Sequence, residues 1–290
     1  MVIFLTSDKI MNNPFFLIML PTFNRPDLVL RSVESIISQK YERYKLVIFN
    51  DGSTKDYSAL ENLIKNHPNV EYIKSENIGI NKSRNIMLTS FLKNDLSDNS
   101  YFFTMSDDDY LIQNSLSQIA SEIKNKKLTW YCFNCESKSQ KVFKNNDYLN
   151  YEVLRYHEFR KKYRGDKHFV FKLNKFKNIR FPDKYFKNGY EHLFYHQIPS
   201  PIQTIPLKVK VIEYFDDGLT LSDLYDNQKT FDVMLKEIKT LPFNLSLYIN
   251  FIKFYLKPKN IVKLIISDEK YYEIKVKLGF RDKRKNKKVN

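Results

Sequence analysis

Residues 15–25 read FFLIMLPTFNR, an uninterrupted apolar run that ends in a polar turn. Six consecutive apolar residues are typical of a strand that is buried on both faces, as in a parallel sheet. Pro26 then stands where a helix can begin, with Asn24 as a candidate cap, and Val29 and Val33 follow at helical spacing. This stretch therefore predicts a strand, a short loop and a helix.

The same alternation recurs three more times in the first 125 residues. Stretches typical of strands at 45–49, 70–74 and 101–105 are each followed by a segment whose apolar residues lie three or four positions apart. A strand and a helix in regular alternation predict an α/β fold, with a mostly parallel sheet covered by helices on both faces.

The composition excludes several classes of protein. The chain has 290 residues, 15% of them aromatic, with only six Gly and two Cys. These values exclude a disordered chain, a collagen-like chain and a disulfide scaffold. The formal net charge of +15 favours an anionic partner, such as nucleic acid, a phosphorylated small molecule or an acidic membrane surface. No spanning helix and no secretory signal are predicted, so a cytoplasmic location is expected.

Polar clusters follow three of the predicted strands, at 21–25, 50–53 and 107–109. In open parallel sheets, ligands bind beyond the carboxyl ends of the strands. The three adjacent carboxylates of the last cluster repel one another unless a cation compensates them. One interpretation is therefore a site for Mg²⁺ or Mn²⁺ and a diphosphate. The other is a solvated acidic turn that caps the next helix.

Four motifs in these positions resemble the family 2 glycosyltransferases, which have the GT-A fold. They follow the family's order and approximate spacing, and the resemblance covers about residues 15–115. The resemblance implies an enzyme that transfers a sugar from a nucleotide donor, and it implies that this nucleotide is UDP. The implied acceptor is a hydroxyl of a bacterial surface glycan such as lipooligosaccharide, capsule or wall polymer. The motifs are PTFNR (21–25), NDGST (50–54), Asn77-Ile78-Gly79 with Ser83-Arg84-Asn85, and SDDDYL (106–111).

The resemblance also implies roles for single residues. Thr22 and Asp51 match positions that hold the uracil and the ribose, and Asp107 matches a ribose contact. Arg84 matches an arginine near the base and the diphosphate. A bound Mn²⁺ or Mg²⁺ would neutralise charge on the leaving nucleoside diphosphate. The implied donor-binding residues are Pro21, Thr22, Asn24, Asp51, Arg84 and Asp107, and the implied metal-binding residues are Asp108 and Asp109.

Three positions bear on the expected chemistry. Asn50 and Ser106 stand where the family has aspartates, so base recognition is expected to differ and the metal to depend on Asp108 and Asp109. Glu191, in the stretch 188–194 (NGYEHLF), resembles the family's general base and implies transfer with inversion. The alternative for Glu191 is an ordinary exposed glutamate at a helix N-terminus.

The chain is expected to have three regions. Residues 1–125 form the nucleotide-sugar-binding half and residues 126–225 the acceptor-binding half of one domain. Residues 226–290 form a basic helical extension, with the apolar stretch 243–257 and the basic tail RDKRKNKKVN. This extension either lies on an anionic membrane, which would put the protein on the inner face of the cell membrane, or packs on the core.

Two other functions also fit part of the sequence. The positive charge and the aromatic residues fit a nucleic-acid-binding protein. Three acids at the predicted ligand edge would repel a phosphate backbone, so nucleic acid is not the expected partner. A GT-A-like domain that binds a nucleotide-sugar or a glycan without turnover would explain why Asn50 and Ser106 replace acids.

Overall fold

The computed structural model describes residues 13–93, 98–124, 126–138, 146–215, 231–257, 261–262, 265–266 and 268–278. The chain divides into two compact units, residues 1–226 and residues 227–290, and each is described by itself. The predicted division of the first unit into a donor half and an acceptor half stays a prediction. The basic tail lies outside the described residues.

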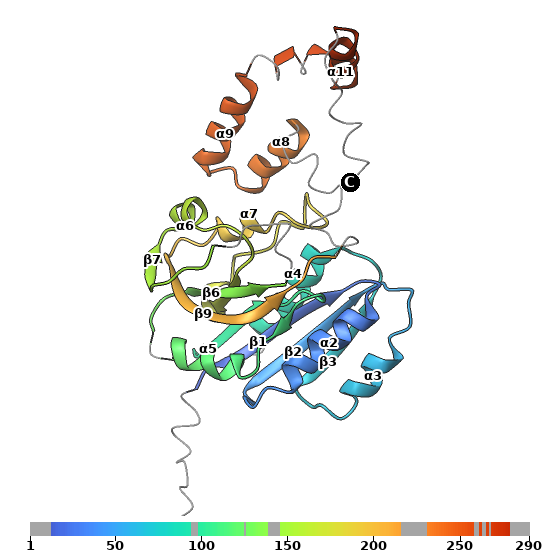
Figure 1. The fold of residues 1–290 in the computed structure, drawn as a ribbon, viewed down its shortest axis with the longest axis vertical. Helices are drawn as coiled ribbons and strands as arrows, with labels where there is room; N and C mark the ends of the chain where they lie inside the picture. Colours follow the sequence, from blue (N-terminus) through green and yellow to red (C-terminus); the bar gives the residue numbers. More distant parts are fainter. Residues whose placement is uncertain are drawn as a thin grey trace, which may run out of the picture. The chain divides into compact units, whose positions relative to one another are not determined.

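In the described part of the first unit, nine strands form one sheet (Figure 1). Their order is β3-β2-β1-β4-β8-β6-β9-β5, and β7 pairs with β9. The first four strands in this order are parallel, which confirms the predicted α/β fold. The strands are β1 (Phe15–Thr22), β2 (Tyr44–Asp51), β3 (Val70–Ser75), β4 (Ser100–Thr104), β5 (Tyr110–Leu111), β6 (Trp130–Ser137), β7 (Glu152–Leu154), β8 (His168–Lys172) and β9 (Ile202–Ile212).

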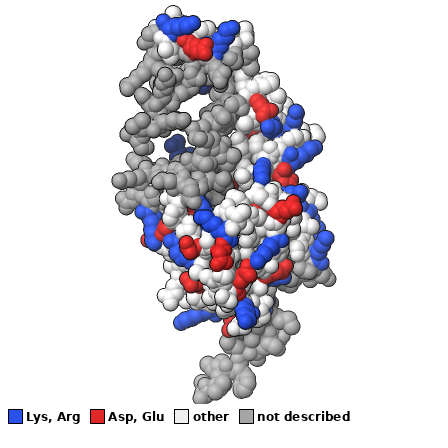
Figure 2. All heavy atoms as spheres, turned by 90° about the vertical axis from the view of Figure 1, so that its right-hand side faces the viewer, with Lys and Arg blue, Asp and Glu red and all other residues white. Residues whose placement is uncertain are grey.

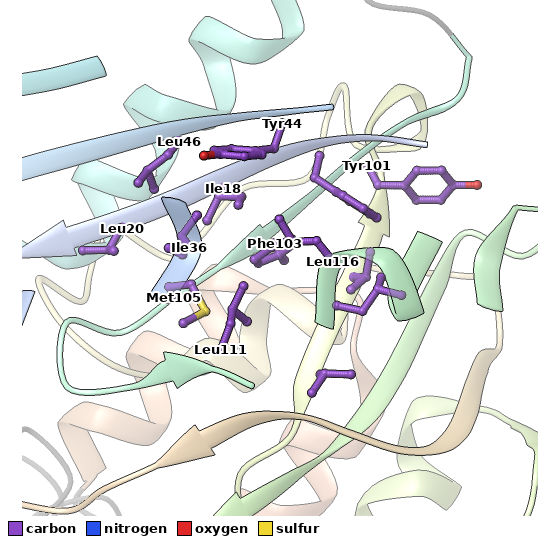
Figure 3. Close-up of a cluster of buried hydrophobic side chains, with 14 of the residues drawn as sticks. Ile18, Leu20, Ile36, Tyr44, Leu46, Tyr101, Phe103, Met105, Leu111 and Leu116 are labelled. Carbon is purple, nitrogen blue, oxygen red and sulfur yellow. The ribbon is translucent and has the colours of Figure 1, made fainter. Parts of the chain in front are cut away.

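Helices cover both faces of this sheet, because β1 buries side chains on each of them. Ile18 and Leu20 pack in a cluster with residues of α2 and α5, and Figure 3 shows them beside Ile36. Leu17 and Met19 point the other way, into a cluster with residues of α4. The helices of the first unit are α2 (Pro26–Ile37), α3 (Ser58–Ile64), α4 (Ile80–Lys93), α5 (Ser115–Ile123), α6 (Tyr156–Lys162) and α7 (Glu191–Tyr195), with a 3₁₀ turn at Leu173–Lys175.

The loop between β1 and α2 differs from the prediction. Arg25, not Asn24, occupies the N-cap position of α2. Asn24 has a φ of 56°, a left-handed conformation that asparagine adopts more readily than most residues. Its Oδ1 accepts a hydrogen bond from the backbone N–H of Thr54 at 2.8 Å. The predicted cap was therefore wrong, and Asn24 instead joins the first polar cluster to the second.

The buried face of α4 is polar near its N-terminus, although it packs against the apolar sheet. Asn81 Nδ2 donates to the carbonyls of Phe186 and Gly189 at 2.8 and 3.0 Å. Asn85 and Phe181 exchange two hydrogen bonds, with Asn85 Nδ2 donating to the carbonyl and Asn85 Oδ1 accepting from the amide. The side chains of α4 thus satisfy backbone groups of the irregular segment 181–189, which has no strand partner to do so.

The second unit is helical in its described residues: α8 (Phe231–Thr240), α9 (Leu245–Tyr255) and α11 (Asp268–Lys277). The Phe231 ring contacts the rings of Phe251 and Tyr255, with centroids 5.6 and 5.5 Å apart, and so joins α8 to α9. Among the described helices, none combines the length and the apolar character that a membrane crossing would need.

The contacts of α4 give a first prediction. Asn85→Ala would leave the amide and the carbonyl of Phe181 buried and unpaired, at a cost of about 1–3 kcal/mol each. We expect the free energy of unfolding to fall by about 2–4 kcal/mol, measured by denaturant unfolding. The matched control is Ile86→Ala, at an exposed position of the same helix, which should change it by about 0.5 kcal/mol or less. Equal effects of the two substitutions would contradict this account.

Candidate active site

The polar clusters that follow β1 and β4 meet at one edge of the sheet. Thr22, the last residue of β1, is buried, and its hydroxyl donates to Asp107 Oδ2 at 3.0 Å. Pro21, just before it, is also buried and lies opposite Phe49 of β2. Parallel strands bring their carboxyl ends to the same edge, and this explains why residues 85 positions apart touch.

Tyr57 connects this edge to the second polar cluster. Its hydroxyl oxygen accepts from the backbone N–H of Arg25 at 3.0 Å and from Ser53 Oγ at 3.1 Å. The same oxygen lies 3.0 Å from Thr22 Oγ1. Sequence reasoning missed this residue, because a lone tyrosine beside a turn carries no signal for partners 32 and 35 positions away.

Asp51, at the end of β2, accepts hydrogen bonds from the backbone amides of the two residues just before α4. Its Oδ1 accepts from Ile78 N–H at 2.8 Å and its Oδ2 from Gly79 N–H at 2.9 Å. Gly79 has a φ of +93°, and a Cβ there would lie 2.7 Å from the carbonyl oxygen of Lys187, so only glycine fits. Asp51 therefore joins the second motif to the third; its nucleotide-binding role stays a prediction.

Asn50 also has a structural contact in the position where the family pattern has an acid. Its Nδ2 donates to the hydroxyl of Tyr72 at 2.7 Å, and its Oδ1 accepts from the backbone N–H of Ser53 at 2.9 Å. The amide thus closes the turn with one of its polar atoms and contacts β3 with the other. Both polar atoms of the Asn50 side chain are therefore paired.

The acidic loop after β4 is compensated by cations from other elements. The Arg25 guanidinium donates to Asp108 Oδ2 at 2.9 Å and lies 3.5 Å from Asp107 Oδ1. Burial and the adjacent Asp108 charge raise the pKa of Asp107 to about 6, although Arg25 and Thr22 lower it. Asp109 is buried and accepts from Lys210 Nζ of β9 at 2.6 Å. Lys210 was also missed by sequence reasoning, since its partner lies 101 residues away.

Arg31 of α2 positions the main chain of the same loop. Its guanidinium donates to the Asp108 carbonyl at 2.7 Å and to Glu213 Oε2 at 2.9 Å. Glu213 also pairs with Lys138 at 2.7 Å, and both cations lie over the ring of Tyr110. A cavity of about 60 Å³ lies beside this arrangement, lined by Ser106, Asp108, Asp109, Asp166, Glu213, Tyr214 and Phe215.

The acids differ in how well they fit a divalent cation. No cluster of three or more His, Cys, Asp or Glu side chains suited to a metal ion occurs in the described part of the chain. Asp108 nevertheless lines the cavity and is partly exposed, and Mg²⁺ commonly takes only one or two carboxylates plus substrate phosphates. Asp108 fits such a site. The carboxylate of Asp109 is occupied by Lys210, and its metal role stays a prediction.

Glu191, the first residue of α7, meets Arg84 of α4. Arg84 NH1 donates to Glu191 Oε1 at 2.9 Å, and the Glu191 side chain remains 32% exposed. Burial raises the pKa of Glu191, but the charge and the hydrogen bond of Arg84 together lower it below its usual value. The structure thus brings together two of the predicted site residues, and Arg84 favours the ionised form of the Glu191 carboxyl.

The described site fits a known family. The family model "Glycosyl transferase family 2" matches residues 17–185, which is more than half of the chain. The chain belongs to glycosyl transferase family 2. This glycosyl transferase family 2 chain carries all four predicted motifs within the matched residues, so the resemblance stated from the sequence is confirmed.

Relatives and solved structures agree with the family. The chain is 25% identical over 183 residues to a GalNAc(5)-diNAcBac-PP-undecaprenol beta-1,3-glucosyltransferase of Campylobacter jejuni, which covers 60% of this chain and 57% of that protein. It resembles the S. aureus TarS 1–349 complex with UDP-GlcNAc (TM-score 0.65, 15% identity, 89% of this chain and 78% of that one). It also resembles GalNAc-T7 with UDP, GalNAc and Mn²⁺ (TM-score 0.61, 15% identity, 86% and 51%).

These likenesses have limits that matter for function. At 15% identity, the two solved structures show only the fold of this chain, and the ligands that they bind are properties of those proteins. Six curated relatives are matched over between 12 and 57% of their own length. The match therefore identifies the domain and the family, whereas the reaction of the whole protein is a matter of proposal.

The buried pair of Asp109 and Lys210 gives a second prediction. Lys210→Met would leave a buried carboxylate without a partner, which costs about 3–5 kcal/mol of stability. The double variant Asp109→Asn, Lys210→Met should recover a large part of that loss, because the buried charge is gone. Denaturant unfolding at neutral pH measures both.

A control on the same strand shows whether the loss of stability comes from breaking the buried pair or from replacing any lysine of β9. Lys208 pairs with Asp147 at 3.1 Å but is half exposed, so Lys208→Met should cost only about 0–1 kcal/mol. If the double variant were as unstable as the sum of its single substitutions, the two groups would not be coupled and the account of the loop would be wrong.

Proposed function

We propose that this chain is a metal-dependent, inverting glycosyltransferase that transfers a sugar from a UDP-linked donor to a hydroxyl of a bacterial surface glycan. The observation that carries the proposal is the meeting of Thr22, Arg25 and the acidic loop at one sheet edge. Family membership supports the reaction type. The likeness to a TarS complex with UDP-GlcNAc supports a UDP-linked donor.

The donor nucleotide would bind along the carboxyl ends of β1, β2 and β4. Thr22 and Asp107 lie at the centre of that edge, and Arg25 contacts the acid next to Asp107. Asp51 and Asn24 fix the loops on either side through backbone hydrogen bonds. Asp51 and Asn24 would therefore contribute to donor binding by fixing the conformation of these loops, in addition to any direct contact with the donor.

Asp108 is the proposed ligand of Mn²⁺ or Mg²⁺, with donor phosphate oxygens completing the coordination. A metal bound there would stabilise negative charge on the departing diphosphate. Arg31 would position Asp108 through its carbonyl, and Lys210 would keep the neighbouring Asp109 carboxylate buried and paired. GalNAc-T7, solved with UDP and Mn²⁺, supports a divalent ion in this fold.

Glu191 is the proposed general base. It would take the proton of the acceptor hydroxyl while the oxygen attacks the anomeric carbon from the side opposite the leaving UDP, which inverts the configuration. The Arg84 contact lowers the pKa of Glu191, which favours the ionised carboxylate, and holds that carboxylate at the start of α7. Arg84 would thus act on the base as well as on the donor.

A membrane-linked glycan is the proposed acceptor, and the inner face of the cell membrane is the proposed location. The name of the Campylobacter relative describes an undecaprenol-linked glycan, which supports this class of acceptor. A nucleic-acid ligand is less well supported, because Figure 2 shows Lys and Arg interspersed with Asp and Glu over the face it draws. A phosphate backbone would favour a continuous basic stripe.

The donor and metal sites can be tested by thermal unfolding with UDP, with and without Mn²⁺. At a hundred times its dissociation constant, UDP should add about 2.7 kcal/mol to stability. We expect the shift to require Mn²⁺ and to be lost in Asp108→Asn, whereas Asp183→Asn, at an exposed carboxylate, should keep it. A shift that is equal with and without the metal would contradict the metal assignment, and no shift would contradict the donor assignment.

The base can be tested by UDP release in the presence of an undecaprenol-linked glycan acceptor. Glu191→Gln should lower the rate by about 10²–10⁴-fold and keep the UDP-induced thermal shift, because the base acts on the acceptor. The matched control is Glu136→Gln, at an exposed glutamate of β6, which should retain the wild-type rate. An active Glu191→Gln enzyme would mean that another group accepts the proton.

A further inference from the structure

Helix α9 of the second unit has three distinct faces. The first face consists of residues spaced four positions apart: Leu247, Phe251 and Tyr255. It packs toward α8, because the rings of Phe251 and Tyr255 contact the ring of Phe231. Ser246, Asn250, Lys253 and Lys257 form a second, polar face. The third face is apolar and exposed, and it consists of Leu245, Tyr248, Ile249, Ile252 and Leu256.

The exposed apolar face is large for a helix of eleven residues. Leu245 and Leu256 are each 69% exposed and Ile252 is 53% exposed. Phe243, just before the helix, is 99% exposed and extends the apolar surface beyond the N-terminus. Single exposed apolar residues are ordinary, but a continuous stripe of them marks an interaction surface.

The charge around this stripe indicates what covers it. Residues 238–267 contain five lysines and no acidic residue. The whole second unit has sixteen Lys or Arg and six Asp or Glu, so its 64 residues carry +10 of the chain's net charge of +15. The lysines of the polar face border the apolar stripe, where their long side chains can reach anionic groups while the stripe is buried.

We propose that α9 binds an anionic lipid bilayer, lying in the headgroup region with the apolar stripe (Leu245, Tyr248, Ile249, Ile252 and Leu256) turned toward the acyl chains. An interfacial helix of this kind combines apolar burial with attraction between lysines and acidic headgroups. The inference deepens the membrane location proposed above by naming the surface, and it does not depend on the sugar-transfer chemistry. A second copy of the chain is disfavoured as the occupant, since two such units would bring like charges together.

The test is flotation of the full chain with phosphatidylcholine vesicles that contain about 30% phosphatidylglycerol, compared with vesicles of phosphatidylcholine alone. We expect binding to the anionic vesicles only, and weaker binding at high salt. Ile252→Asp and Leu256→Asp should each lower vesicle binding by about ten-fold or more. Leu149→Asp, at a leucine of the first unit that is more exposed than either, should bind as wild type does.

Two further measurements keep the outcomes distinct. The thermal shift with UDP and Mn²⁺ reports on the first unit, so a stripe variant that keeps this shift but loses vesicle binding supports the proposal. If the wild type shows no thermal shift with UDP and Mn²⁺ but floats with anionic vesicles, the transferase proposal is contradicted and the membrane proposal is supported. Absence of flotation by the folded wild type would overturn the inference. The inference would also be overturned if sedimentation velocity showed a wild-type dimer that Ile252→Asp dissociates, and if the same substitution left vesicle binding unchanged.

Discussion

The structure of the site depends on one set of contacts: each of the buried polar side chains Asn81, Arg84 and Asn85 of α4 bonds a group from another segment of the chain. An unpaired buried amide or carboxylate costs free energy comparable to a whole hydrogen bond. Asp51 satisfies amides just before α4, Asn81 and Asn85 satisfy the backbone of residues 181–189, and Arg84 pairs with Glu191. Because these contacts form one connected set, the edge of the parallel strands and the start of α7 are fixed relative to each other.

A second constraint is electrostatic. Three consecutive carboxylates can stay together in a partly buried loop only if cations reach them. Arg25 comes from the loop after β1 and Lys210 from β9, while Arg31 of α2 holds the loop's main chain. The carboxylates of the loop are therefore compensated by Arg25 and Lys210, which come from two different elements. Asp108 and Asp109 both line the cavity, and Asp109 is buried against Lys210, so Asp108 is the acid proposed to bind an added cation.

The sequence predicted those features of the fold and the site that depend on residues close together in the chain. The apolar run of β1 predicted a strand buried on both faces, and the four motifs predicted which strand ends carry polar groups. Partners that are distant in sequence were not predictable, because neither Tyr57 nor Lys210 has a local pattern that reveals its role. Asn24 was assigned as a helix cap from its position, but the left-handed turn that it adopts directs its side chain to Thr54 instead.

Charged residues are distributed differently in the two units of the chain. In the first unit, acids and bases neutralise each other in short contacts around the site, which fixes side chains in place. In the second unit, lysines greatly outnumber acids and the exposed face of α9 is apolar, which leaves both charge and apolar surface available to a partner. A glycan acceptor linked to a lipid is confined to the membrane surface. An enzyme held there by a separate unit would meet it by diffusion in two dimensions, without altering the paired charges on which its catalytic site depends.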